Sequence, residues 1–317
     1  MSQPSPTPRR GRLLRIGAAC AVLLALAGYL VVHFTTGGKG APRCTVRAAG
    51  KDGAAYRMQP EQAVNAATIE AVGSSRGLPE RAVTIALATA MQESGLRNIS
   101  YGDRDSIGLF QQRPSQGWGA ARQIRDPVYT AGKFYDHLVR VPGYSRLPLT
   151  VAAQKVQRSG FPQAYAKHEP DAALLSSALT GRSAGAFSCT TGSDDGTPGS
   201  PARVRDRLIR DFGPGVLPRT EAAGGDQGAA GAGKSRSGSV VVVPVASAAT
   251  PGSAGRRGWE VAHWAVAKAS GLRIAQVSYA GRVWSAEDSE KGWQKADADS
   301  GPEKIRGSDE VLITTAQ

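Results

Sequence analysis

Apolar positions recur at helical spacing through residues 60–95. From Pro60 to Val72, alanine and valine residues stand three or four positions apart, which places them on one face of a helix. The next segment, LPERAVTIALATAMQES, is more apolar and starts with Pro79, a residue tolerated in the first turn. Gly95 follows it as a C-cap residue. We therefore predict two consecutive helices, the second one buried.

Further helices are predicted after a polar segment. Asp126 and Pro127 form an N-cap and first-turn pair before PVYTAGKFYDHLVRV, and Thr150 is expected to cap VAAQKVQRS. Pro162 opens a last helical stretch. Between the second and third helices lie residues 98–119, NISYGDRDSIGLFQQRPSQGWG, without regular spacing. A long polar loop between apolar helices favours a functional role for that loop.

The pattern changes after residue 190. Residues 191–255 are rich in Gly, Ser, Ala and Pro, which predicts a flexible linker. Within it, PARVRDRLIRDF is compatible with a short basic amphipathic helix, and VVVVPV with an isolated strand. Residues 256–317 contain one helical segment, GWEVAHWAVAKASG, and two strand-like segments, RIAQVSYAGRVWSA and EVLITTA. We expect a small α+β module there.

An almost wholly apolar run, LLRIGAACAVLLALAGYLVVHF, occupies residues 13–34. About 20 apolar residues suffice for a helix to cross a membrane. Arginines without acidic residues precede the run, in residues 1–12, which predicts a cytoplasmic N-terminus and an extracytoplasmic remainder. A cleaved signal peptide is the alternative, although its apolar region is usually shorter. Residues 35–55 then form a spacer, and residues 56–190 a mainly helical domain.

The charge of the chain favours an anionic partner. The formal net charge is +13, which suits anionic wall polymers, lipid or nucleic acid. The predicted export disfavours nucleic acid. No metal site or cofactor is predicted, because no phosphate-binding glycine loop is present and the histidines have no metal-ligand spacing: His33, His137, His168 and His263.

Three cysteines are present. Cys20 lies in the apolar run and is expected to stay a thiol. Cys44 and Cys189 flank the helical domain, and an oxidising exterior permits a disulfide between them. Closing so long a loop stabilises a fold by very roughly 4–5 kcal/mol in the chain-entropy treatment.

Glu93 is the leading candidate for chemistry. It lies at the C-terminal end of the second helix, after turns that carry Ala86, Leu87, Ala90 and Met91. Apolar surroundings disfavour a charged carboxylate and raise its pKa. A general acid in glycoside cleavage needs that property, because it must be protonated near neutral pH. A surface glutamate near a helix end is the other interpretation.

Two short elements around Glu93 carry a family resemblance. Residues 93–96, Glu-Ser-Gly-Leu, and residues 108–111, Gly-Leu-Phe-Gln, resemble the soluble-type lytic transglycosylases. The similarity extends over residues 58–180 and is closest to a subgroup common in high-GC Gram-positive bacteria. It implies a lysozyme-like fold and cleavage of peptidoglycan between N-acetylmuramic acid and N-acetylglucosamine. Glu93 is the implied catalytic acid.

The resemblance has one departure. The family's Ala-Tyr-Asn element, whose tyrosine orients the catalytic acid, is replaced by Ala-Gln-Lys at residues 153–155. Another tyrosine hydroxyl could take over this role, with Tyr165 as our first choice among Tyr101, Tyr129, Tyr144 and Tyr165. A non-catalytic glycan-binding or scaffold module on a degenerate lysozyme fold is the alternative function.

The reaction depends on whether a second carboxylate is present. Asp103 and Asp105 lie in the loop after Glu93, but both suit turn positions. With such a partner the enzyme would be a lysozyme-type hydrolase. Without one, the resemblance implies that Glu93 acts first as acid and then as base, leaving a 1,6-anhydro-muramic end. The predicted substrate-binding residues are Ser94, Asp105, Gln111, Gln112 and Tyr165.

Overall fold

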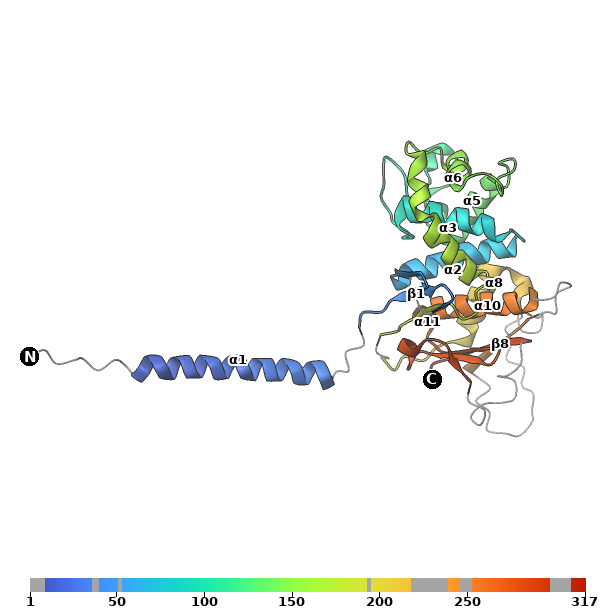
Figure 1. Cartoon of the computed structure of the whole chain (residues 1–317). Helices are drawn as coiled ribbons and strands as arrows, with labels where there is room; N and C mark the ends of the chain where they lie inside the picture. Colours follow the sequence, from blue (N-terminus) through green and yellow to red (C-terminus); the bar gives the residue numbers. More distant parts are fainter. Residues whose placement is uncertain are drawn as a thin grey trace, which may run out of the picture. The chain divides into compact units, whose positions relative to one another are not determined.

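The computed structural model describes residues 9–35, 40–50, 53–192, 195–217, 239–245, 253–296 and 309–317. The chain divides into two units, Met1–Ala41 and Pro42–Gln317 (Figure 1). The predicted linker falls partly outside the described residues, at 193–194, 218–238 and 246–252, as do parts of the predicted N-terminal tail and spacer.

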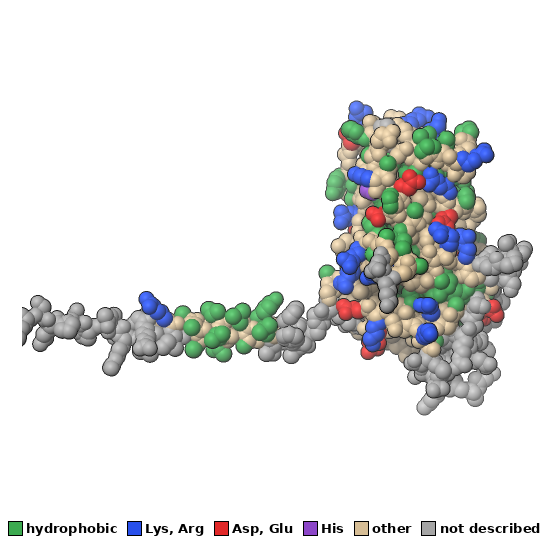
Figure 2. All heavy atoms as spheres, viewed as in Figure 1, with side chains coloured by type: hydrophobic (Ala, Val, Ile, Leu, Met, Phe, Trp, Pro, Cys, Tyr) green, Lys and Arg blue, Asp and Glu red, His purple; other side chains and the backbone are tan. Residues whose placement is uncertain are grey.

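The first unit contains helix α1, Arg9–Thr35. Figure 2 shows apolar side chains over the visible face of its middle part. Leu23, Leu24 and Tyr29 of this helix are exposed. Among the residues that the structure describes, no helix is both long and apolar enough to span a bilayer. The predicted membrane anchor, and with it the single-pass localisation, is therefore wrong.

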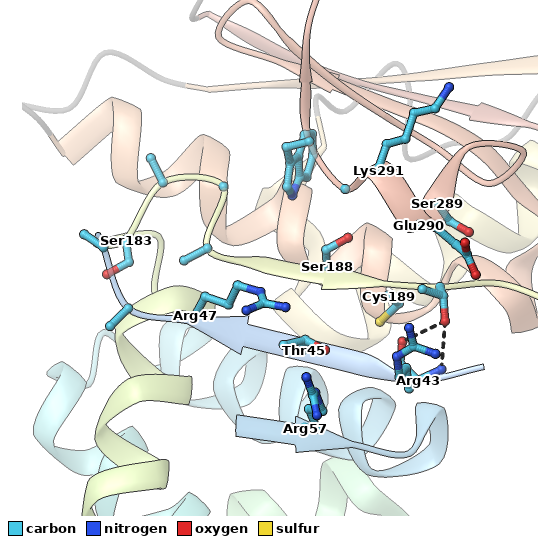
Figure 3. A pocket seen from close by; sticks show the side chains of 18 of the residues that line it. Arg43, Thr45, Arg47, Arg57, Ser183, Ser188, Cys189, Ser289, Glu290 and Lys291 are labelled. Carbon is cyan, nitrogen blue, oxygen red and sulfur yellow. Dashed lines mark hydrogen bonds between the residues drawn. The ribbon is translucent and has the colours of Figure 1, made fainter. Parts of the chain in front are cut away.

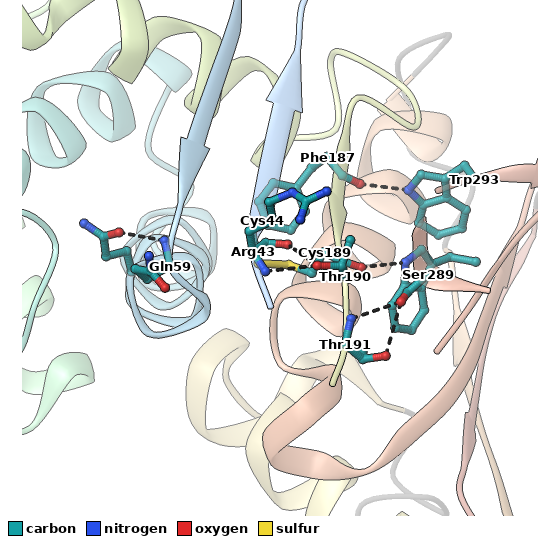
Figure 4. The surroundings of a disulfide bond; sticks show 11 residues. Arg43, Cys44, Gln59, Phe187, Cys189, Thr190, Thr191, Ser289 and Trp293 are labelled. Atoms are coloured by element: carbon teal, nitrogen blue, oxygen red, sulfur yellow. Dashed lines mark hydrogen bonds between the residues drawn. A yellow bond between two sulfur atoms is a disulfide. The ribbon is translucent and has the colours of Figure 1, made fainter. Parts of the chain in front are cut away.

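The second unit begins with a small antiparallel sheet in the order β2-β1-β3. Its strands are β1 (Cys44–Arg47), β2 (Ala55–Met58) and β3 (Phe187–Cys189). Cys44 and Cys189 are directly opposed on β1 and β3, and the predicted disulfide joins them (Figure 4). The bridge closes a separation of 145 residues and ties the start of the unit to the end of its helical part.

Two buried helices form the centre of the helical part. They are α2 (Pro60–Ser75) and α3 (Glu80–Ser94), and every residue from 82 to 91 of α3 is buried. A helix that is apolar on all sides needs neighbours on all sides. Accordingly α2 packs against α5 (Pro127–Leu138), and α3 packs against α7 (Glu169–Leu179).

Helix ends in this part follow local sequence signals. Asp126 caps α5, and its side chain accepts a hydrogen bond from the Val128 backbone N–H at 3.0 Å. Helix α6 (Leu149–Gln157) begins one residue before Thr150, so Thr150 lies within the helix instead of capping it. The remaining short helices are α4 (Ala121–Ile124), η1 (Pro114–Gln116) and η2 (Pro162–His168).

The C-terminal part forms a five-stranded antiparallel sheet in the order β4-β8-β5-β6-β7. The predicted isolated strand is its edge strand β4 (Val240–Pro244), paired along its length with β8 (Glu310–Thr315). The other strands are β5 (Ile274–Tyr279), β6 (Arg282–Ser285) and β7 (Gln294–Lys295). Helix α10 (Ser253–Ala267) packs against both β5 and α2, so it lies between this sheet and the helical part (Figure 1). Short helices α11 (Ala269–Leu272), η3 (Pro214–Val216) and η5 (Ser289–Lys291) complete this part.

A buried polar network joins the two parts. Helix α8 (Pro201–Phe212) packs against α2, and its Asp211 is 1% exposed. Lys268 Nζ lies 3.0 Å from Asp211 Oδ2 and donates to Thr68 Oγ1 of α2 at 2.7 Å. Trp264 Nε1 of α10 donates to the same Asp211 oxygen at 2.9 Å. Removing the Asp211 carboxylate would leave the buried Lys268 ammonium group without its acidic partner, which is strongly destabilising.

The expected fold class is therefore wrong in its organisation. The described residues hold helices and two antiparallel sheets, in place of a mainly α domain between a membrane helix and a separate module. Residues 201–212, expected within a flexible linker, form a helix of the core, because its Val204, Leu208 and Phe212 are buried. Buried residues of 259–293 and 311–313 share one core with the helical part, and residues 42–317 form one unit.

Candidate functional site

Glu93 lies in the last turn of α3, where the helix ends in a tight turn. Gly95 adopts the left-handed conformation (φ 62°), and Leu96 follows with φ 61°. The Gly95 N–H donates to the Met91 carbonyl, which is the bond of the αL capping motif, and the Leu96 N–H donates to the Ala90 carbonyl, both at 3.0 Å. Leu96 is fully buried, so this turn is fixed by packing and holds Glu93 at a defined place.

The turn is also tied to the neighbouring helix α2. Gln62 Nε2 donates to the Gly95 carbonyl at 2.7 Å, and Asn65 Nδ2 donates to the Leu96 carbonyl at 2.8 Å. These bonds satisfy two carbonyls that the helix end leaves without intrahelical partners. The position of Glu93 is thus set by side chains about thirty residues earlier in the chain.

A tyrosine hydroxyl contacts the Glu93 carboxyl directly. Tyr165 of η2 is fully buried, and its Oη donates to Glu93 Oε1 at 2.6 Å. Burial raises the pKa of Glu93, while hydrogen bonds from Tyr165 and Gln157 lower it; burial prevails. Burial and the nearby Glu93 charge raise the pKa of Tyr165, so its hydroxyl remains protonated and donates. The departure from the family pattern at residues 153–155 therefore does not leave Glu93 without an aromatic hydroxyl.

The Gly-Leu-Phe-Gln loop is attached to the end of α3. Ser94 Oγ lies 2.7 Å from the Leu109 carbonyl and 3.1 Å from the Ala90 carbonyl. Its single proton is used inside the protein, which makes Ser94 a link between helix and loop. Gln157 Nε2 donates to the Phe110 carbonyl at 2.7 Å from the opposite side.

The two glutamines of the loop have different surroundings. Gln112 is 1% exposed, accepts from Thr130 Oγ1 at 2.7 Å and donates to the Thr130 carbonyl. Its amide is therefore used within the core. Gln111 is half-buried at φ 48°, and its Nε2 lies 3.3 Å from the carbonyls of Tyr101 and Gly108. Only Gln111 of this pair is placed where a ligand could reach it.

Asp105 shapes the polar loop. Its Oδ1 accepts from Arg113 Nε and its Oδ2 from the Ser115 backbone N–H, both at 2.8 Å. The Arg113 hydrogen bond, followed by that of Ser115, holds the pKa of Asp105 well below its usual range. Asp105 therefore stays ionised and is engaged at both oxygens. Asp103 is exposed, and its carbonyl accepts from the Ser106 N–H in a turn.

Exposed aromatic rings flank the site in sequence. Tyr101, whose carbonyl accepts from Gln111, is 73% exposed, and Phe161, in the loop that leads to Tyr165, is 80% exposed. Rings of this kind suit stacking on a sugar. Trp118 is less available, because it is half-buried and its ring packs on His137 with centroids 4.3 Å apart.

The comparisons with known proteins bear on another part of the chain. A family model described as the VldE C-terminal domain matches residues 203–304. This match covers about a third of the chain and includes none of the residues around Glu93. No curated protein matches the chain.

The sequence prediction missed two features of the structure. Gln157 donates a hydrogen bond to the loop and lowers the pKa of Glu93. The available signal for it was the repeat of glutamine at positions 154 and 157, which lie on the same side of a helix. The second feature is a cavity of about 670 Å³ that Glu93 does not line. Alternation of arginine and threonine through Arg43, Thr45 and Arg47 was the available signal for it.

Proposed function

We propose that the chain cleaves peptidoglycan between N-acetylmuramic acid and N-acetylglucosamine as a lytic transglycosylase, with Glu93 as acid and then as base. The observation that carries this proposal is the 2.6 Å hydrogen bond from Tyr165 to a half-buried Glu93 whose pKa burial raises. A raised pKa keeps a carboxyl protonated at the pH where it must donate. The Glu-Ser-Gly-Leu and Gly-Leu-Phe-Gln elements supply the independent support.

The proposed reaction needs one carboxyl group. Protonated Glu93 gives its proton to the oxygen of the leaving N-acetylglucosamine, and the bond from that oxygen to C1 of the muramic residue breaks. The Glu93 carboxylate then takes the proton of the muramic C6 hydroxyl. Oxygen O6 bonds to C1, which gives the 1,6-anhydro sugar, consumes no water and returns Glu93 to its protonated form.

The state of Asp105 supports this mechanism over hydrolysis. A nucleophile or general base needs a carboxylate oxygen that is free to reach the sugar or a water molecule. Both oxygens of Asp105 accept hydrogen bonds from the loop itself. Of Glu93 and Asp105, only Glu93 then has a carboxyl group available for the reaction, and Tyr165 orients it.

Mass spectrometry of a peptidoglycan digest tests the proposal. Purified sacculi treated with the full chain should yield muropeptides that end in 1,6-anhydro-muramic acid, each lighter by one water than the hydrolysis product. Glu93→Gln should release none. New reducing ends would instead identify a hydrolase. Glycan binding without any release of muropeptides by the wild-type chain would favour the non-catalytic alternative.

A further inference from the structure

A basic groove lies over the outer face of the first sheet, on β1, β2 and β3. We define the basic groove as the cavity of about 670 Å³ lined by these strands, by the loop before β3 and by residues 289–293 (Figure 3). Its walls carry five basic residues and one acidic residue, Glu290. The basic residues are Arg43, Arg47, Arg57, Arg182 and Lys291.

Three of these arginines form no ion pair within the part of the chain that the structure describes. Arg182 is paired with Glu80, and Lys291 with Asp288, at 2.8 and 2.9 Å. Arg43, Arg47 and Arg57 are exposed and make no ion pair with any described residue. A guanidinium group presents a rigid fork of donors that matches phosphate and carboxylate oxygens. The groove therefore offers three free forks to an anionic ligand.

The strand geometry sets the spacing of these groups. Residues 43, 45 and 47 share one face of β1, since successive side chains alternate across a strand. Arg43 and Arg47 are four residues apart, so their α-carbons are about 13 Å apart at 3.3 Å per residue. Arg57 lies beside Thr45 on β2, between these two along the row (Figure 3). A row of this length exceeds one small anion and suits a ligand with several charged groups in line.

Hydroxyl groups lie between the guanidinium groups. Thr45 is paired with Arg57 on one side and with Ser188 on the other. Ser188 Oγ is shielded from solvent and has no hydrogen-bond partner in the described part of the chain. A phosphate group presents several oxygens in tetrahedral directions, so it can accept hydrogen bonds from arginines on the strands and from the hydroxyl groups between them at the same time.

We infer that the basic groove binds a linear phosphate polymer, with Arg43, Arg47 and Arg57 contacting successive phosphate groups. Glu290 opposes this binding, because it places a negative charge on the same wall. The groove shares no lining residue with the Glu93 site, so this binding does not depend on peptidoglycan cleavage.

Fluorescence polarisation with labelled linear polyphosphate and the full chain tests this proposal. The triple variant R43Q/R47Q/R57Q should bind at least about tenfold more weakly, from three lost exposed charge contacts. Its plot of log affinity against log salt should be shallower by roughly 2, at about 0.7 per phosphate. The matched control R122Q/R140Q/R146Q removes the same charge from exposed arginines of the helical part and should bind nearly as well as wild type.

Glu290→Gln separates the proposal from a folding defect. It should bind polyphosphate a few-fold more tightly than wild type, which a misfolded chain would not do. Equal losses in the two triple variants, or an unchanged affinity in Glu290→Gln, would overturn the proposal. An affinity for polyglutamate equal to that for polyphosphate would also overturn it. So would displacement of the labelled polyphosphate by inorganic phosphate as effectively as by unlabelled polyphosphate, at the same total concentration of phosphate groups.

Discussion

Glu93 and Glu70 are both glutamates whose pKa burial raises, and they differ in what surrounds them. Glu93 ends its helix, is half-buried and receives a hydrogen bond from a protonated tyrosine. Glu70 lies in the middle of α2 and is 1% exposed, and neither of its carboxyl oxygens has a hydrogen-bond partner among the described residues. One carboxyl is accessible and oriented, and the other is enclosed.

The neighbour of Glu70 explains how an enclosed acid is tolerated. Burial, followed by the nearby negative charge of Glu260, raises the pKa of Glu70 well above its ordinary value. Arg257 lies 2.8 Å from Glu260 and balances one negative charge of the pair. Glu70 is then protonated over a wide pH range. A raised pKa alone therefore does not identify a catalytic acid; access and a hydrogen-bond donor that orients the carboxyl are needed as well.

The largest expected effect separates the two acids by activity. Glu93→Gln removes the proton that is transferred, so muralytic activity should fall by about a thousandfold, within the range for general acid catalysis. Glu70→Gln is the matched control, because it makes the same change in another helix and should retain activity. Both are measured as release of soluble muropeptides from sacculi. An equal loss of activity in both variants would contradict the assignment of Glu93, and not Glu70, as the catalytic acid.

Tyr165→Phe tests what orients Glu93. Loss of the hydroxyl should lower activity by roughly tenfold to a hundredfold, because the carboxyl is no longer held. The Tyr165 hydrogen bond lowers the pKa of Glu93 by favouring the carboxylate, so its removal raises that pKa further. The alkaline limb of the pH–activity profile should therefore move to higher pH. A lower activity with an unmoved limb would contradict this account. Tyr129→Phe is a control, since its hydroxyl contacts only the Trp118 carbonyl.

Helix ends and the disulfide could be predicted because their signals are local. Gly95 ends α3 and Asp126 caps α5 as expected, since one residue decides each. Cys44 and Cys189 pair as predicted. The sequence does not distinguish Tyr165 from the other candidate tyrosines on geometric grounds. Which hydroxyl reaches Glu93 depends on how η2 packs on α3.

Long-range organisation could not be predicted. The composition of residues 191–255 indicated a linker, yet α8 within it buries Val204 and Leu208, and its Asp211 meets a lysine 57 positions later. Asp211 lies in a basic segment whose composition suggests exposure to solvent, so the sequence does not indicate that it pairs with a buried lysine. The same holds for Glu70, whose acidic neighbour comes from a helix almost two hundred residues away.

Glu70→Gln should change the stability of the chain although it leaves activity unchanged. Because the pKa of Glu70 is raised in the folded chain, its contribution to stability is complete below the ordinary pKa of a glutamate. It is lost as the pH rises through the raised value. Glu70→Gln removes this loss, so thermal unfolding at alkaline pH should occur a few degrees higher than in wild type. Calorimetry from acidic to alkaline pH measures it. A stabilisation seen only at acidic pH would reverse the assigned sign.

The smallest effect is expected from Asp105→Asn. Under the single-acid mechanism this residue only organises the loop through Arg113 and Ser115, so activity should fall less than about fivefold. Asp105 has a lowered pKa, so its contribution to loop stability is present above the ordinary pKa of an aspartate and is lost as the pH falls through the lowered value. A loss as large as that of Glu93→Gln, together with reducing ends in the wild-type digest, would make Asp105 a second catalytic carboxylate. The comparison would then be between two pairs of acids. Glu93 and Asp105 would form a catalytic pair, whereas Glu70 of α2 and Glu260 of α10 form a buried pair.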